Sequence, residues 1–164
     1  MLEIGVNTYA SIKEVESYII SSYGEDSEYF AYWDGLDSTS KEMLLKKSLM
    51  QIENLPFTGV RKYKNQALEF PRTHGNQEVL VGSITIPDFA KFAQIDNAIA
   101  MFTVGRNSEM QNRVALQRNG VTSFKLGDFS ETYGNSSGSI LELADQQIIK
   151  YFTNWLYGGY RLVW

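Results

Sequence analysis

Residues 86–102 read IPDFAKFAQIDNAIAMF, and this stretch decides the fold that we expect. Four apolar residues recur in it at spacings of three and four, which place them on one face of an α-helix: Phe92, Ile95, Ile99 and Phe102. Pro87 suits the first turn of a helix, because the N–H that it lacks would have no partner there. Alanines between these positions allow a second helix to approach closely. We therefore predict the strongest core helix here, with a pattern that could continue past Gly105 toward Arg118.

A second helix is predicted upstream, over residues 11–22. Ser11 and Glu14 have the spacing of a capping box, in which each side chain binds the backbone N–H of the other residue. An apolar stripe at helical spacing follows: Ile12, Val15, Ile19 and Tyr23. We expect Gly24 to end this helix in a left-handed conformation.

Two more helices and one ambiguous segment complete the helical pattern. Residues 38–54 form a helix that Asp37 or Ser38 can cap. The last helix is predicted over residues 139–157, where two glycines end it. The acidic and aromatic residues 25–37 suit either a short helical turn or an ordered loop.

The connections between the helices are of two kinds. Residues 55–87 are punctuated by prolines and glycines and are expected to be irregular or extended. A connection of this length inside a small domain is usually functional or ordered by a partner. Residues 121–126 and 129–133 flank Gly127 and Asp128, which is typical of a tight β-hairpin.

The length and composition suit one domain and narrow the possible chemistry. The chain has 164 residues, no cysteine and one histidine, His74. The lack of cysteine excludes disulfides, thiolate metal sites and cysteine nucleophiles, and one histidine cannot form a two-histidine metal motif. The predicted fold is mainly α, a small bundle of about four helices with a β-hairpin. Residues 1–157 form its single domain, and residues 158–164 form an extended C-terminal tail.

Targeting signals and motifs for common chemistry are missing from the sequence. The N-terminus, MLEIGVNTY, lacks the basic and apolar regions of a secretory signal, and no apolar run approaches the ~20 residues of a membrane span. No phosphate-binding glycine loop, calcium loop or nucleophile elbow is present. His74 is therefore interpreted as a surface-loop residue. We predict no catalytic residue, no metal, no cofactor and no membrane partner.

Charge is unevenly distributed along the chain, whose formal net charge is −4. Residues 1–37 contain eight acidic residues and one basic residue, whereas residues 38–75 contain seven basic and three acidic ones. A weakly acidic protein is a poor general binder of nucleic acid. The asymmetry is compatible with charge pairing between copies of the chain or with a solvated acidic face.

Two short segments are candidates for contacts with partners. The first is Arg61, Lys62, Tyr63 and Lys64, where basic residues flank an aromatic ring, as in single-stranded nucleic-acid sites; a solvated loop is the alternative. The second is the C-terminus, where six of the 22 aromatic residues lie within residues 151–164. We predict that part of it docks on a partner, although packing on its own domain is the alternative. The predicted docking residues are Trp155, Tyr157, Tyr160, Arg161, Leu162 and Trp164.

A series of short motifs in a fixed order resembles one known family. The central motif is QALEFPRT at residues 66–73, with its Pro71-Arg72 pair. Before it lie TYASIKEV at 8–15 and LDSTSKE at 36–42; after it lie Ile86-Pro87 and GVTSFKLG at 120–127. With these motifs the chain resembles the head–tail connector proteins of long-tailed bacteriophages, also called adaptor or head-completion proteins. Some members of that family are labelled DnaT-like single-stranded DNA-binding proteins.

The resemblance implies a structural role in the neck of the virion. Copies of the chain would form a ring, expected to be dodecameric, below the portal protein, with most contacts between helices of neighbours. The ring would extend the channel through which DNA passes without sequence-specific binding, and a stopper or tail-completion protein would dock below it. The C-terminal tail would dock on the portal, and assembly would take place in the host cytoplasm.

Two other functions remain open at this point. The first is a single-stranded DNA-binding accessory protein of replication, which predicts salt-sensitive binding of oligonucleotides. The second is a small hydrolase that uses His74, although no motif supports it.

Overall fold

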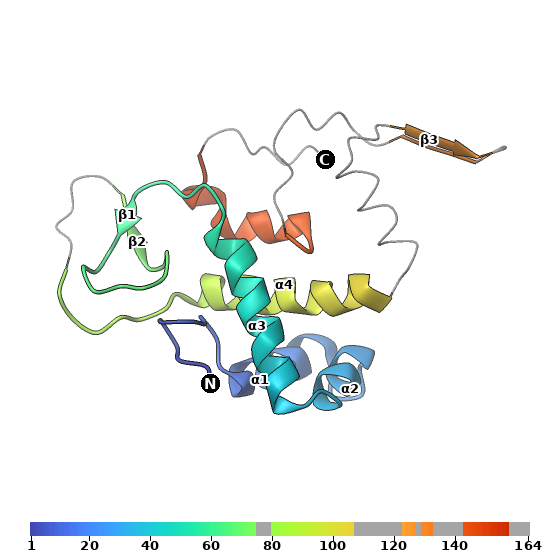
Figure 1. The fold of residues 1–164 in the computed structure, drawn as a ribbon, viewed down its shortest axis with the longest axis horizontal. Helices are drawn as coiled ribbons and strands as arrows, with labels where there is room; N and C mark the ends of the chain where they lie inside the picture. Colours follow the sequence, from blue (N-terminus) through green and yellow to red (C-terminus); the bar gives the residue numbers. More distant parts are fainter. Residues whose placement is uncertain (75–79, 107–122, 127–128, 133–142, 158–164) are drawn as a thin grey trace.

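The central element of the fold is helix α4 (Asp88–Arg106), which lies between two layers (Figure 1). In the computed structural model, α1 (Ile12–Tyr23) and α2 (Glu28–Asp34) lie on one side of α4, and the 3₁₀-helix η1 (Gln146–Trp155) lies on the other. Helix α3 (Ser38–Glu53) crosses α4 and packs against it. The structure describes residues 1–74, 80–106, 123–126, 129–132 and 143–157.

Two small antiparallel pairs of strands accompany the helices. Strand β1 (Val60–Arg61) pairs with β2 (Arg72–Thr73), and β3 (Ser123–Leu126) pairs with β4 (Phe129–Thr132). In the second pair the last residue of β3 is opposite the first residue of β4, so the predicted hairpin is confirmed. The fold is thus mainly helical, a small bundle with a hairpin, as the sequence predicts. None of the helices in the described ranges is long and apolar enough to cross a membrane.

Helix α1 begins and ends at the residues that the sequence marks. The Glu14 N–H donates to Ser11 Oγ at 3.2 Å, and the Ser11 N–H donates to Glu14 Oε2 at 2.7 Å, which confirms the capping box. Gly24 ends the helix with φ +91° and ψ 155°. Its φ is positive, as in a left-handed helical residue, but its ψ lies outside the left-handed helical region, so the predicted cap conformation is wrong. Its N–H still donates to the Ile20 carbonyl, which completes the last turn.

The next two helices follow the sequence pattern as well. Asp37 caps α3, with its Oδ1 accepting a hydrogen bond from the Ser40 N–H at 2.9 Å. The ambiguous segment 25–37 contains a helix, α2, because Ser27 caps it and Trp33 is buried on its inner face. The helical alternative for this segment is therefore the correct one.

The last predicted helix, over residues 139–157, is too long at its start. Residues 143–145 are not helical, and η1 begins only after Asp145, whose Oδ1 accepts from the Gln147 N–H at 2.8 Å. The physical reason lies in α4, where Asn97 Oδ1 accepts the Ala144 N–H at 3.0 Å and so removes it from any local helix. Residues 139–142, the predicted extension of α4 toward Arg118 and the predicted tail at 158–164 lie outside the described residues.

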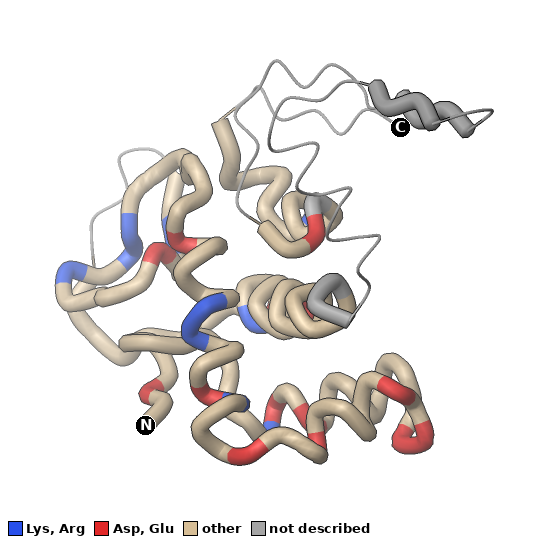
Figure 2. The backbone as a smooth tube through the Cα atoms, turned by 45° about the vertical axis from the view of Figure 1, so that its right-hand side comes forward, with Lys and Arg blue, Asp and Glu red and all other residues tan. Residues whose placement is uncertain are grey.

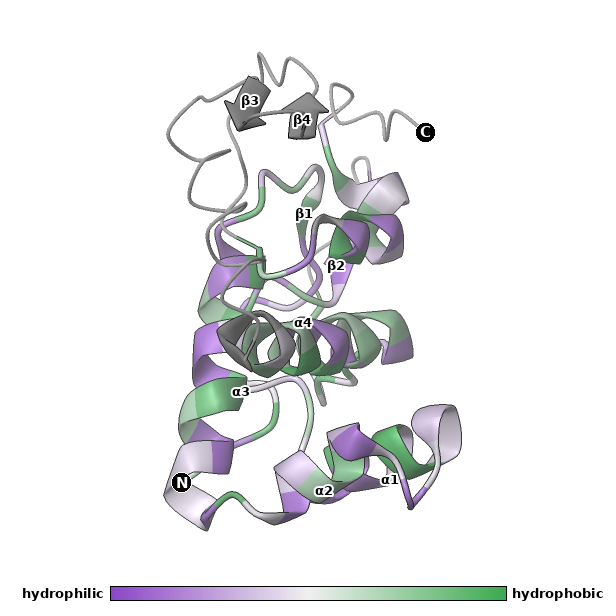
Figure 3. Cartoon of the chain, turned by 90° about the vertical axis from the view of Figure 1, so that its right-hand side faces the viewer, coloured by the Kyte–Doolittle hydropathy of each residue, from purple (hydrophilic) through white to green (hydrophobic). Residues whose placement is uncertain are grey.

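Helix α4 contributes to two hydrophobic clusters. Its ribbon carries both hydrophobic and hydrophilic residues (Figure 3). The first cluster joins it to α3, η1 and the connection before α4; its members include Tyr9, Leu49, Ile52, Leu68, Phe70, Ile148 and Phe152. The second joins it to α1, α2 and α3; its largest members are Val15, Ile19, Trp33, Leu45, Ile95, Ile99 and Phe102. Three residues of the predicted stripe are therefore buried. The fourth, Phe92, is 39% exposed and packs on the Tyr18 ring instead.

A buried polar side chain on α4 links the two clusters. Gln94 is 0% exposed, and its Oε1 accepts the backbone N–H groups of Tyr9 at 2.8 Å and Ala10 at 3.0 Å. Its Nε2 donates to the Leu45 carbonyl of α3 at 2.9 Å and to Thr8 Oγ1 at 3.0 Å. One amide thus holds the segment before α1, helix α3 and helix α4 in a fixed arrangement. A buried amide has this effect because each lost hydrogen bond leaves a desolvated polar group.

One turn further along α4, Asn97 adds a second buried amide. Its Nδ2 donates to Gln51 Oε1 of α3 at 2.9 Å, while its Oδ1 accepts the Ala144 N–H described above. Ser48 Oγ of α3 donates to the Gln94 carbonyl at 2.6 Å. These contacts fix α3 and the start of η1 against the same helix.

The connection over residues 55–87 is irregular, as predicted, but it is also part of the core. Leu68, Phe70 and Ile86 are buried in the first cluster. Gly59 has φ +75°, and a Cβ atom there would lie 2.4 Å from the Thr73 carbonyl oxygen, so only glycine fits beside β2. The described parts of this connection, residues 55–74 and 80–87, are therefore held by packing within the chain itself.

Replacing Gln94 by methionine should remove these hydrogen bonds while nearly keeping the side-chain volume. We expect Gln94→Met to lower the free energy of unfolding by about 3 kcal/mol, because the buried N–H groups of Tyr9 and Ala10 and the Leu45 carbonyl lose their partner. Urea denaturation followed by circular dichroism measures the change. The control is Gln147→Met at an exposed position, which should stay within about 0.5 kcal/mol of the native protein. Equal stability of the two variants would contradict this account.

The capping residue Glu14 should make stability depend on pH. Desolvation opposes its charge, but hydrogen bonds from Lys91 and Ser11 outweigh this and lower the pKa of Glu14 below its ordinary value. A lowered pKa stabilises the folded state at neutral pH, and the stabilisation is lost as the pH falls through the folded-state pKa. The difference in unfolding free energy between the native protein and Glu14→Gln should therefore be largest near neutral pH and should shrink in acid. Thermal melts over this range test it, with exposed Glu25→Gln as the control that should show little difference at any pH.

Candidate functional site

The predicted nucleic-acid segment, residues 61–64, lies on the connection between α3 and α4, and its first residue is already paired. The Arg61 Nη2 atom is 2.7 Å from Glu69 Oε1, and Nη1 donates to the Gln66 carbonyl at 3.4 Å. The hydrogen bond to Glu69 raises the pKa of Arg61 above its ordinary value. The charge of Arg61 is thus offset within the chain, and its main role is to hold the segment together.

The other three residues of the segment present their side chains at the surface. Lys64 is exposed, Lys62 and Tyr63 are half-buried, and the Lys62 Nζ atom lies 5.8 Å from the centroid of the Tyr63 ring. Their backbone is fixed, because Lys62 N–H donates to the Pro71 carbonyl at 3.0 Å and Lys64 N–H to the Leu80 carbonyl at 3.2 Å. In the part of the chain that the structure describes, no carboxylate is paired with either lysine. We call Lys62, Tyr63 and Lys64 the basic loop.

A buried arginine stabilises the chain segment that contains the basic loop. The Arg72 side chain is only 7% exposed; it pairs with Glu69 and donates to the carbonyls of Thr58 at 2.8 Å and Gly59 at 2.7 Å. Its guanidinium also lies over the Phe57 ring, 5.7 Å from the centroid. The Pro71-Arg72 pair that marks the sequence motif therefore has a structural role: it closes the chain segment on which β1 and β2 lie.

A second buried contact ties the same segment to α3. The Tyr9 hydroxyl donates to Glu53 Oε1, and Glu53 Oε2 accepts the Glu69 N–H at 2.9 Å. The Phe70 N–H donates to the Tyr9 hydroxyl oxygen at 3.3 Å. Burial raises the pKa of Glu53 and also that of Tyr9. Sequence reasoning missed these residues, because their partners are far apart in the chain and no local pattern marks them.

The predicted docking residues fall into three groups. Trp155 packs within its own chain: its ring stacks on His74, with centroids 4.1 Å apart, and meets Phe70 edge-on. The Trp155 carbonyl also accepts the Thr58 N–H at 2.6 Å. Tyr157 is 68% exposed and available at the surface. The remaining predicted residues lie outside the described part of the chain: Tyr160, Arg161, Leu162 and Trp164. Docking through this end of the chain stays a prediction.

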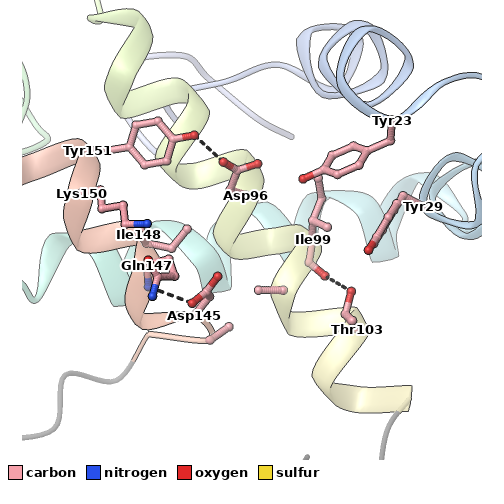
Figure 4. Close-up of a pocket in the computed structure, with 12 residues that line it drawn as sticks. Tyr23, Tyr29, Asp96, Ile99, Thr103, Asp145, Gln147, Ile148, Lys150 and Tyr151 are labelled. Atoms are coloured by element: carbon pink, nitrogen blue, oxygen red, sulfur yellow. Dashed lines mark hydrogen bonds between the residues drawn. The ribbon is translucent and has the colours of Figure 1, made fainter. Parts of the chain in front are cut away.

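A cavity that the sequence does not indicate lies between α1, α2, α4 and η1 (Figure 4). Its volume is about 730 Å³. The rings of Tyr23 and Tyr29, with centroids 4.5 Å apart, lie on one side, and Tyr151 lies on the other, beside Asp96. Ile99 and further residues of α4 and η1 complete the lining. We call this cavity the tyrosine pocket; its four contributing elements meet only through the tertiary fold.

The carboxylate of Asp96 is the polar centre of the tyrosine pocket. Its Oδ2 accepts a hydrogen bond from the Tyr151 hydroxyl at 2.5 Å, whereas its Oδ1 is buried and has no hydrogen-bond partner among the described residues. Burial raises the pKa of Asp96, although the hydroxyls of Tyr151 and Tyr18 stabilise the charged form. Burial and the nearby Asp96 charge raise the pKa of Tyr23 to about 12. The pocket therefore contains a carboxylate with one buried oxygen that accepts no hydrogen bond from the described residues.

The described residues contain no cluster of candidate metal ligands. Within ranges 1–74, 80–106, 123–126, 129–132 and 143–157, no three histidine, aspartate or glutamate side chains converge as metal ligands. His74, the residue of the hydrolase hypothesis, is exposed and stacks on Trp155. The expectations that the protein is not an enzyme and holds no metal or cofactor stay predictions.

Comparison with known protein families gives a match over most of the chain. A family model described as "Putative DnaT-like ssDNA binding protein" matches residues 2–157, which include every described helix and strand, the basic loop and the tyrosine pocket. No curated protein and no solved structure matches the chain. Since the matched region is nearly the whole sequence, the chain belongs to this DnaT-like family.

Proposed function

We propose that this protein is a structural component of a bacteriophage virion, a head–tail connector whose copies form a ring below the portal protein. The observation that supports it best is the separation of charge on one small helical body. Acidic residues gather along α1 and α2, and the basic loop lies at a different end of the molecule (Figure 2). The ordered motifs that resemble connector proteins support the same function.

The acidic end consists of exposed carboxylates around the turn between α1 and α2 and at the end of α2: Glu25, Asp26, Glu28 and Asp34. Within the described ranges none of them has an ion-pair partner. A closed ring brings one surface of each copy against a different surface of its neighbour. In the proposed ring, the acidic end of one copy meets the basic loop of the next, so that both sets of charges gain partners.

The remaining roles in the proposed assembly come from the resemblance to connector proteins. The ring surrounds the channel and lets DNA pass without sequence-specific binding. The C-terminal tail docks on the portal together with the exposed Tyr157 that precedes it, and the opposite face of the ring receives the stopper or tail-completion protein. The protein acts in the neck of the virion after assembly in the host cytoplasm, and its mechanism is association rather than catalysis.

Charge reversal tests the proposed contact between neighbours. We expect the native protein mixed with its portal to give rings in negative-stain images at low salt, and Lys62→Glu with Lys64→Glu to abolish them. Adding Glu25→Lys and Asp26→Lys to that variant should restore rings, because the charges are then exchanged between the two surfaces. The control is Lys13→Glu with Lys47→Glu, which changes net charge equally and should leave the rings intact. If the native protein forms no ring and no complex with the portal, the proposal is contradicted.

The same assay tests the tail. A chain truncated after Gly159 should keep its cooperative unfolding, because the core residues of η1 precede that point. It should lose the complex with the portal while still folding. Portal binding by the truncated chain at native strength would show that the tail is not the docking element.

A second candidate function is binding of single-stranded DNA, and the family match favours it. The basic loop offers the required chemistry: the Tyr63 ring can stack on a base, while Lys62 and Lys64 beside it meet phosphates. Such a protein would act in replication rather than in the virion. The net charge of −4 predicts that binding is confined to this loop and is sensitive to salt.

Fluorescence anisotropy with a labelled oligothymidine measures this second function. Lys62→Ala with Lys64→Ala should weaken binding and reduce the salt slope by about 1.4, since each phosphate contact to a single strand contributes about 0.7. Tyr63→Ala should cost about 1–3 kcal/mol through the lost stacking. Lys13→Ala with Lys47→Ala is the matched control and should leave binding unchanged. Undetectable binding of the native protein at low salt would exclude this function.

A further inference from the structure

The tyrosine pocket is open to solvent and has a volume that suits a small ligand. Its volume of about 730 Å³ lies within the range of known ligand pockets, roughly 300–1,000 Å³. Apolar side chains of α4 and η1, Ile99 and Ile148, form part of the wall, and a few polar groups converge on it. This combination is typical of sites in which apolar contacts give affinity and polar groups give selectivity.

The polar groups of the pocket disfavour a negatively charged ligand. Asp96 has one oxygen that accepts from Tyr151 and one buried oxygen without a hydrogen-bond partner in the described chain. Asp145 is a second carboxylate in the lining, where it also caps η1, and Lys150 is the one cation among the lining residues that the structure describes. A half-buried carboxylate is stabilised by an opposite charge and destabilised by a further negative charge. An anionic ligand is therefore disfavoured here.

The aromatic rings of the pocket favour a particular kind of cation. Tyr23 and Tyr29 lie close together at an interplanar angle of 44° and are directed toward the cavity in Figure 4. The faces of such rings attract organic cations, and the attraction is larger where water is partly excluded. A strongly hydrated metal ion would gain little from these rings, whereas a guanidinium or alkylammonium group combines charge with apolar contact.

We propose that the tyrosine pocket is a binding site for an organic cation, a guanidinium or alkylammonium group held between the Tyr23 and Tyr29 rings and the Asp96 carboxylate. The cation has two chemically equivalent sources: a free small molecule, or the arginine or lysine side chain of a second copy of the chain. The site is separate from the basic loop and does not depend on either function proposed above.

Titration with matched probes tests the site. Butylguanidinium should cause saturable NMR shifts of the Tyr23 and Tyr29 ring signals, whereas butylurea, its neutral analogue, should not. Asp96→Asn should weaken binding at least about tenfold, because the carboxylate that compensates the charge is lost. Asp88→Asn, an exposed aspartate on the same helix, is the control and should bind like the native protein. Equal binding of the two probes, or native affinity in folded Asp96→Asn, would overturn the proposal.

Two further measurements complete the test. If Asp96→Asn does not fold, Tyr23→Leu replaces it, since Tyr23 is 42% exposed and its removal leaves the core intact. Weaker binding by Tyr23→Leu supports the site, and unchanged binding overturns it. Sedimentation velocity distinguishes the sources: excess butylguanidinium dissociates any oligomer if a second copy supplies the cation, and leaves its mass unchanged if a free molecule does.

Discussion

The arrangement of this protein depends on the side-chain amide of Gln94. It is fully buried on α4, and it accepts two backbone N–H groups from the segment before α1 while it donates to the carbonyl of Leu45 on α3. Because each of these groups would otherwise be desolvated without a partner, the three segments are held at one separation and one register. The two hydrophobic clusters bury the apolar side chains, but apolar packing alone allows neighbouring helices to shift against one another. The hydrogen bonds of the Gln94 amide allow only one arrangement.

The same segment before α1 also connects the core to the surface through hydrogen bonds. Tyr9, whose N–H binds Gln94, donates its hydroxyl to Glu53, and Glu53 accepts the N–H of Glu69. Glu69 in turn holds Arg61 and the buried Arg72. The basic loop is therefore attached to the centre of the fold through a continuous path of polar contacts. A surface segment fixed in this way presents its charges in a constant position, which suits contacts with a neighbouring copy or with a DNA backbone.

The two proposed functions use the same loop in different ways. A connector ring needs it to meet the acidic end of the next copy, whereas single-stranded DNA binding needs it free to meet phosphates. The acidic end favours the ring, since it supplies a partner of opposite charge on every copy. The description of the family favours DNA. The tyrosine pocket lies apart from this question, because it is built by α1, α2, α4 and η1 and carries a negative rather than a positive charge.

The sequence by itself determined the local structure. Capping residues and apolar spacing located α1, α3 and α4, and a two-residue spacing between β-forming segments located the hairpin, because these signals act between near neighbours. Only the tertiary structure decided where η1 begins, since Asn97 of α4 takes the Ala144 N–H. It likewise decided that Arg61 pairs with Glu69, that Trp155 packs on His74 and that four elements form a pocket around Asp96. These outcomes depend on partners distant in the chain, and a linear pattern contains no information on which distant groups will meet.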